Sequence, residues 1–207
     1  GGRRDGADAR HPGLSRPDIL HGGRVRVMDT SSSLDRQAVH EELERVRATF
    51  HRLLDGASEA DLRRPTKGTR WTNEQLLFHM LFGYILMRPL LLLIRIFGRF
   101  PRGVGRVFAR LLDAGTKPFD VVNYLGPVGG ARILGRRRTG TVFDRVIAFL
   151  HQRLDTEREA DFALAMPYPT RWDPFFRNVM TVADLYRYPT RHFNFHRAQL
   201  TLTAKDR

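Results

Sequence analysis

A run of nineteen nearly uninterrupted apolar residues constrains this chain more than any other feature of its sequence. Residues 76–94 read LLFHMLFGYILMRPLLLLI, and only His79 and Arg88 break the apolar pattern. The length approaches that of a membrane span, but Arg88 and Pro89 lie inside the run and Arg95 follows it, and cations are costly at a bilayer centre. We therefore expect a helix buried in a protein core, with a helix lying on a membrane surface or a transmembrane span as the alternatives.

Apolar residues also recur every three to four positions in two other segments, which predicts amphipathic helices over residues 34–54 and 141–160. The connection after the first of these helices, residues 58–70, is expected to contain one short helical turn. The two apolar stripes consist of Val39, Leu43, Val46, Phe50 and Leu53 in the first segment and Phe143, Val146, Leu150 and Leu154 in the second.

A capping signal marks the start of the helix that carries the apolar run. Thr72 is followed three residues later by Gln75, which is the pattern of a capping box. We expect the segment 71–87 to open this helix, with Trp71 just before the cap, and Pro89, which cannot donate a backbone hydrogen bond, to end or kink the helix near Met87–Arg88.

The last predicted helix starts near Thr181, is disturbed at Pro189 and runs to about Thr203. No segment shows the two-residue alternation or the hairpin dipeptides that predict strands. Four long helices with apolar stripes predict an all-α fold, and a four-helix bundle is the architecture that buries them.

Positive charge is concentrated in the middle of the chain. The net charge is +13, and residues 95–138 contribute +8 because ten Lys and Arg face only Asp113 and Asp120. We expect residues 88–140 to form a basic insertion between the second and third bundle helices, with a helix at 104–113. The charge suits an anionic ligand, a membrane surface or nucleic acid, or a solvated face without a partner. The absence of any known nucleic-acid motif disfavours nucleic acid.

The first 27 residues are rich in Gly, Arg and Pro and contain no apolar segment of the kind found in signal peptides. We expect residues 1–27 to be a disordered extension or a leader, and residues 28–207 to form the domain. The chain has no Cys, which excludes disulfides, zinc fingers and catalysis by a protein thiolate. This composition fits a reducing compartment, and a cytoplasmic location is expected.

Three of the eight histidines attract attention as metal ligands. His192 and His196 are four residues apart, so on a helix both rings project from one face, and such a pair can bind one metal ion. His79 lies in the apolar run, where an imidazole needs a partner. It is either a third ligand or a core histidine bonded to a carbonyl or a tyrosine. Phe193 stands where zincin metalloproteases have Glu, which disfavours that class.

Two segments together resemble the DinB-like (DNA-damage-inducible) superfamily: RWTNEQLLFH at 70–79 and RHFNFHRAQL at 191–200. The resemblance runs from Met28 to the C-terminus. It implies a four-helix bundle of up-down-down-up type, a divalent ion (nickel or zinc) bound by His79, His192 and His196, and a homodimer in many members. Members include thiol S-transferases that use bacillithiol or mycothiol, and mycothiol-dependent maleylpyruvate isomerase. The resemblance thus suggests mycothiol, or another low-molecular-weight thiol, as cosubstrate.

The residues around the histidine pair suggest how a small-molecule substrate is bound. Arg191 and Arg197 are candidates for binding the carboxylates of the thiol or of its partner, with plain surface arginines as the alternative. Gln199 is a candidate for orienting a ligand. The sequence identifies no catalytic residue, and Tyr186, Tyr188 and Asn194 are equivalent as possible donors. Two non-catalytic functions stay open, namely sequestration of a small molecule and binding of an anionic ligand or membrane surface.

Overall fold

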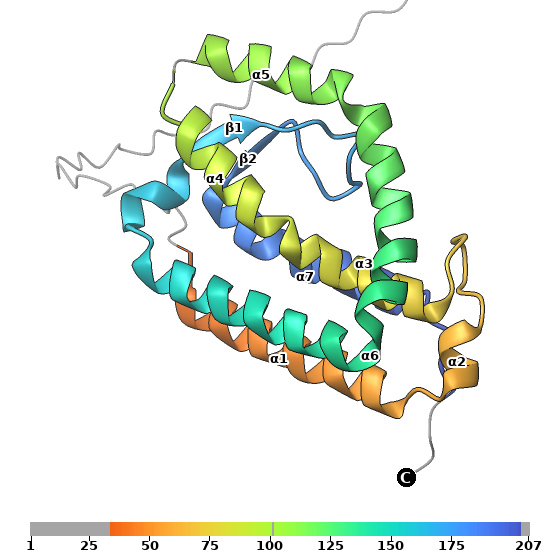
Figure 1. Cartoon of the computed structure of the whole chain (residues 1–207). Helices are drawn as coiled ribbons and strands as arrows, with labels where there is room; N and C mark the ends of the chain where they lie inside the picture. Colours follow the sequence, from red (N-terminus) through yellow and green to blue (C-terminus); the bar gives the residue numbers. More distant parts are fainter. Residues whose placement is uncertain (1–33, 101, 204–207) are drawn as a thin grey trace, which may run out of the picture. The chain divides into compact units, whose positions relative to one another are not determined.

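The computed structural model describes residues 34–100 and 102–203, and most of these residues are helical (Figure 1). The extension predicted for residues 1–27 lies outside this range. The elements, in chain order, are α1 (Arg36–Gly56), α2 (Glu59–Arg63), α3 (Asn73–Ile85), α4 (Met87–Phe97), α5 (Arg102–Ala114), α6 (Thr116–Thr156), the 3-10 helix η1 (Glu159–Ala163), β1 (Ala165–Pro167), β2 (Val179–Thr181) and α7 (Val182–Arg197).

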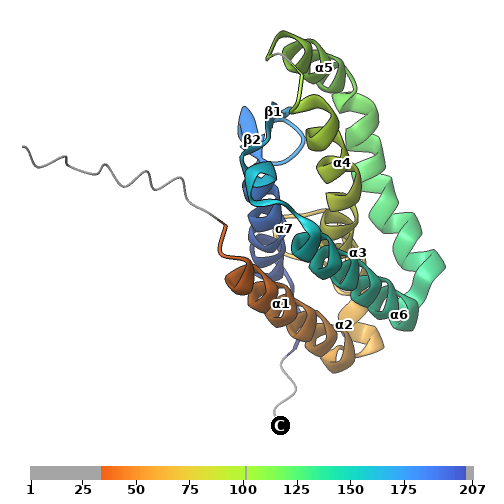
Figure 2. The same cartoon turned by 90° about the vertical axis from the view of Figure 1, so that its left-hand side faces the viewer.

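Four helices pack into a bundle, as the apolar stripes predict. α1 and α3 each contact both α6 and α7, so every helix has two main neighbours (Figures 1 and 2). Each helix places one fully buried aromatic ring at the centre: Phe50, Tyr84, Phe143 and Phe193. The ring centroids of Phe50 and Phe143 are 4.2 Å apart, and those of Tyr84 and Phe143 are 5.1 Å apart. This arrangement confirms the all-α bundle.

The start of α3 agrees with the capping signal. The Thr72 side chain accepts a hydrogen bond from the Gln75 backbone, and the Gln75 side chain accepts one from the Thr72 backbone. Both bonds satisfy N–H groups that have no partner inside the helix. Trp71 lies just before the cap, where the capping pattern places it.

The helix of the apolar run is interrupted shortly before Pro89, close to the expected end or kink near Met87–Arg88. α3 stops at Ile85, the chain turns at Leu86, and α4 starts at Met87. Pro89 is then the third residue of α4, where its missing N–H costs no helical hydrogen bond. Residues 73–97 are long and apolar enough to cross a membrane, but 61% of the most apolar window is buried within the protein. The fold therefore uses the apolar run as a core element.

The region predicted as an insertion contains α4, α5 and the first part of α6, residues 116–134. Gly135 has a φ of 62° and breaks α6, so residues 136–156 form a separate straight segment that belongs to the bundle. The first part of α6 lies close to α3. A Cβ at Gly130 would be 2.1 Å from the Phe78 ring, and the Trp71 indole donates to the Tyr124 carbonyl at 3.4 Å.

Two features of the C-terminal third differ from the sequence prediction. β1 and β2 form a short antiparallel ladder in which Met166 is paired with Met180, although we predicted no strand. Each strand has three residues, too few to show an alternating pattern. The ladder closes the loop of residues 168–178 at its base.

The last helix also ends earlier than predicted, at Arg197 instead of near Thr203. Its continuation leaves the helix because it bonds to other elements. The Thr201 backbone donates to the Asn73 side chain at 2.9 Å, and the Thr203 hydroxyl donates to Asp61. Pro189 lies within α7 without interrupting it.

Candidate metal centre

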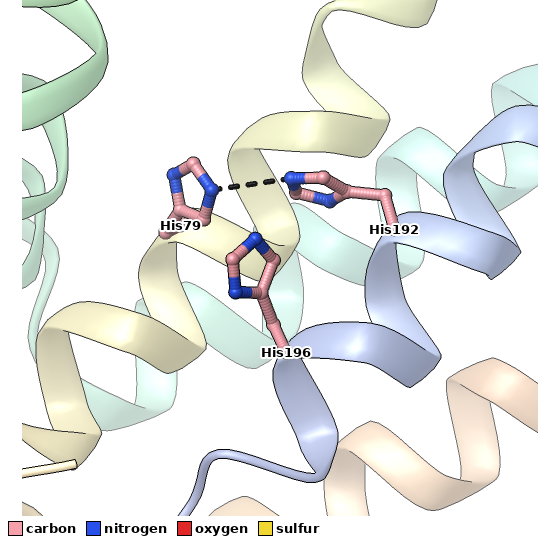
Figure 3. Close-up of side chains that lie close together, drawn as sticks. All are labelled: His79, His192 and His196. Carbon is pink, nitrogen blue, oxygen red and sulfur yellow. Dashed lines mark hydrogen bonds between the residues drawn. The ribbon is translucent and has the colours of Figure 1, made fainter. Parts of the chain in front are cut away.

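The three histidines predicted as ligands meet at one place in the bundle. His79 projects from α3, and His192 and His196 project from successive turns of α7 (Figure 3). The Nε2 atoms of His79 and His192 are 3.1 Å apart. One ring nitrogen from each histidine lies within 4.8 Å of the other two, and no other such group of three potential ligands occurs in the part of the chain that the structure describes.

Burial keeps these rings neutral. His79 and His192 are only 4% and 3% exposed, and His196 is partly buried. Desolvation, with a smaller contribution from His196, lowers the pKa of His79 to about 3. Desolvation also lowers the pKa of His192 far below its ordinary value and lowers that of His196. Since metal ions bind the neutral imidazole, the site is prepared for a cation at neutral pH.

Neighbouring residues fix the orientation of the rings. The Nδ1 atom of His196 lies 2.7 Å from Oε1 of Gln199, so Nδ1 donates and Nε2 keeps its lone pair. Gln199 thus contacts one of the three predicted ligands, and its orienting role stays a prediction. Trp71 covers the His79 ring at 4.5 Å between centroids. Gly83 makes room for His192, because a Cβ at that position would be 2.7 Å from Nδ1.

The donor set fits a divalent transition metal. Three imidazoles with converging nitrogens are the ligands found in zinc sites that keep a position open for water or substrate. No Lys or Arg contributes to the pocket that adjoins the rings, so no side-chain cation competes for the place. His79 and His192 each have a buried Nδ1 without a hydrogen-bond partner among the described residues. Because buried polar atoms normally have a partner, these two nitrogens are available to a ligand or a water molecule.

A small pocket with aromatic walls adjoins His79 and His192. Trp172, from the loop of residues 168–178, stacks on Phe119 of α6 at 4.2 Å and donates to the Thr116 hydroxyl at 3.2 Å. The loop and the first part of α6 therefore form one wall together. The lining residues besides the two histidines are Phe82, Gly83, Leu86, Leu90, Phe119, Asn123, Trp172, Asp173, Phe176 and Tyr188.

The structure separates the three side chains that the sequence left equivalent. Tyr188 lines the pocket, and its hydroxyl donates to Asp173 at 2.9 Å. Tyr186 instead donates to Glu157 at 3.0 Å, and Asn194 lines a different groove. Sequence reasoning missed Asp173, for which a lone carboxylate in a Pro-rich loop gives no signal.

The two arginines next to the histidine pair lie outside the pocket lining. Arg191 is exposed, and Arg197 lines a groove between α1 and α7 together with Glu42 and Arg45. Their role in binding carboxylates stays a prediction.

The comparisons with known proteins agree with this geometry. A comparison with curated proteins and one with solved structures each found no match. A family model described as DinB superfamily matches residues 42–200, a range that includes all three histidines. Because this match covers well over half of the sequence, the chain belongs to the DinB superfamily.

Proposed function

We propose that this protein is a metal-dependent transferase that joins a low-molecular-weight thiol, such as mycothiol, to a small electrophile. The observation that carries the proposal is the convergence of three neutral imidazoles beside an aromatic pocket. A bound zinc or nickel ion would lower the pKa of a coordinated thiol and hold the resulting thiolate for attack. Because the chain has no Cys, the thiol arrives as a cosubstrate.

The protein's own residues contribute binding and shielding. His79, His192 and His196 would hold the ion, and the rings of Phe119 and Trp172 would keep water away from the reacting atoms. The pocket is small and largely apolar, so it favours a compact electrophile over a long or highly charged one.

Turnover of thiol distinguishes this function from its alternatives. Protein loaded with zinc or nickel is mixed with mycothiol or bacillithiol and a panel of small electrophiles, and the loss of free thiol is followed. We expect turnover that disappears with a chelator and in His79→Ala, while circular dichroism shows a folded variant. Stoichiometric binding of the electrophile without product would support sequestration instead.

A second candidate function, binding to an anionic membrane surface, is favoured by the exposed face of α5 and the first part of α6. Arg110, Lys117 and Arg132 are exposed there beside large apolar residues, a combination typical of helices that lie on membranes. The exposed apolar side chains on these helices include Val107, Leu111, Val121, Val122, Leu125 and Ile133.

Flotation with vesicles tests this second function. Binding to anionic but not to neutral vesicles, weakened by salt and by Leu125→Ser/Ile133→Ser, would support it. The histidine variants are expected to bind vesicles like the wild type. If the protein floats with neither anionic nor neutral vesicles, a membrane role for this face is excluded.

A further inference from the structure

One carboxylate lies beside the three histidines, and the transferase proposal gives it no role. Asp173 belongs to the loop between β1 and β2 and is only 9% exposed. Its Oδ2 lies 3.6 Å from Nε2 of His192, the same nitrogen that faces His79. We propose that Asp173 is a fourth protein ligand of the metal ion, an inference that rests on the metal site of the proposed function.

The spacing between Asp173 and His192 approaches that of two ligands of one ion, although Asp173 lies outside the group of ligand atoms within 4.8 Å of one another, which contains the three histidines alone. Two ligands at about 2.1 Å from one metal are about 3.0 Å apart at a right angle and about 3.4 Å apart at the tetrahedral angle. The distances from His192 Nε2 to His79 Nε2 and to Asp173 Oδ2 are 3.1 and 3.6 Å. A shift of a few tenths of an ångström at Asp173 brings the second distance into that range.

Two hydrogen bonds hold the carboxylate in this place. The Tyr188 hydroxyl donates to Oδ2 at 2.9 Å, and the Phe175 backbone donates to Oδ1 at 2.8 Å. Tyr188 lies one helical turn before His192 on α7, so one helix positions both the histidine and the carboxylate. Each carboxylate oxygen has two lone pairs and keeps one for a metal. Ligating carboxylates are commonly supported by such bonds.

The surroundings of Asp173 otherwise lack positive charge. Within residues 34–100 and 102–203, its one ion-pair partner is His192, a ring that burial keeps neutral. Burial also raises the pKa of Asp173 above its ordinary value. Buried carboxylates in proteins are normally paired or bound to metals, and a metal ion between Asp173 and the histidines supplies the missing charge.

Coordination by Asp173 would connect the metal to the pocket wall. The same loop carries Trp172, which stacks on Phe119. Metal binding should therefore protect the amides of residues 168–178 from hydrogen exchange in the wild type.

The test compares three variants of the full chain. Asp173→Asn removes the charge at constant shape, and Tyr188→Phe removes only the supporting hydroxyl. Asp144→Asn is the matched control, because Asp144 is also bonded to a histidine, His51 at 2.8 Å, but lies on the surface. Zinc affinity is measured by competition with a chromophoric chelator, and cobalt(II) absorption reports the ligand set.

We expect Asp173→Asn to weaken zinc binding roughly 10–100-fold and to change the cobalt spectrum, and Tyr188→Phe to weaken binding by less. The Asp144→Asn control should match the wild type in both. The inference is overturned if Asp173→Asn has the zinc affinity, the cobalt absorption spectrum and the hydrogen-exchange protection of residues 168–178 that the wild type has. The three-histidine site would then stand without Asp173. A wild-type protein that binds neither ion would overturn the metal site as well, so the two failures are distinguishable. If Asp173→Asn does not fold, Tyr188→Phe provides the test. The inference is overturned if Tyr188→Phe matches the wild type in zinc affinity, cobalt absorption and hydrogen exchange of the loop.

Discussion

The protein contains two groups of histidines that differ in almost every physical respect. His79, His192 and His196 lie between α3 and α7, deep in the bundle. His40 and His151 lie between α1 and α6, with about a quarter of each side chain exposed. Their Nδ1 atoms are 2.5 Å apart, so one ring donates to the other.

The positions of carboxylates separate the two groups. On the surface, His40 Nε2 lies 2.9 Å from Asp155, and His151 Nε2 lies 2.8 Å from Glu44. These contacts occupy the ring nitrogens of both surface histidines with hydrogen-bond partners. Inside the bundle, no carboxylate of the described residues is that close to the three rings, and burial lowers their pKa values, so that each ring is neutral and keeps one nitrogen with a free lone pair. Proximity of histidines therefore does not by itself make a metal site; desolvation and the local charges decide which nitrogens keep free lone pairs.

The largest effect on metal binding is expected at Gly83, where the His192 ring leaves no room for a side chain. In Gly83→Ala the new methyl group collides with the His192 ring, and such overpacking costs about 1–3 kcal/mol. Displacement of the His192 ring should weaken zinc binding roughly 100-fold, which is the upper end of the range of about 10–100-fold for changes that misorient a metal ligand. Zinc titration measures this. Gly126→Ala is the control, since nothing lies within 4 Å of a Cβ there, and equal affinities for both variants would contradict the account.

Acid should sharpen the contrast between the groups. The pKa values of all three interior histidines are lowered, that of His79 to about 3, so protons compete with the metal only well below the ordinary histidine value of about 6.5. Zinc should stay bound at pH 5.5 in equilibrium dialysis. Without metal, the fold should lose stability as the pH falls below about 6.5, because the unfolded chain takes up these protons first. Release of half of the zinc near pH 6.5 would contradict the lowered pKa values of the three histidines.

A smaller effect is expected at the edge of the interior group. Gln199→Ala removes the acceptor of His196 Nδ1–H and leaves the ring free to turn. Zinc affinity should fall about 10-fold, the lower end for the loss of an orienting partner. Gln199→Glu, which keeps an acceptor oxygen, should retain affinity, and a loss as large as in Gln199→Ala would argue against an orienting role.

The smallest effect on metal binding should come from the surface group. His151→Gln breaks the contacts with His40 and Glu44, which should lower the free energy of unfolding by about 1 kcal/mol. Urea unfolding measures this change. Metal content should equal that of the wild type, and a reduced content would show that the surface pair takes part in binding.

The sequence predicts those parts of the structure that depend on local spacing. The apolar stripes place the bundle helices, the Thr72–Gln75 pair marks the start of α3, and the interval between His192 and His196 places both rings on one face. The participation of His79 depends on which helices are neighbours. That information is not local, and the prediction for His79 therefore relied on the resemblance to the family.

The parts that the sequence does not reveal depend on contacts between distant residues. Asp173 reaches the site because a three-residue ladder closes its loop and because Trp172 stacks on Phe119. The early end of α7 depends on the bond from Thr201 to Asn73, 128 residues away. Neither contact leaves a periodic or capping signal in the sequence.

The metal content of the purified protein shows whether the three histidines bind an ion. Untagged protein purified without a nickel column is analysed by elemental mass spectrometry. The His192→Ala/His196→Ala double variant is analysed in parallel, with His40→Gln as the surface control. We expect about one divalent ion per chain in the wild type and in His40→Gln, and none in the double variant. No metal in the wild type after incubation with zinc or nickel, or equal content in the double variant, would contradict this expectation.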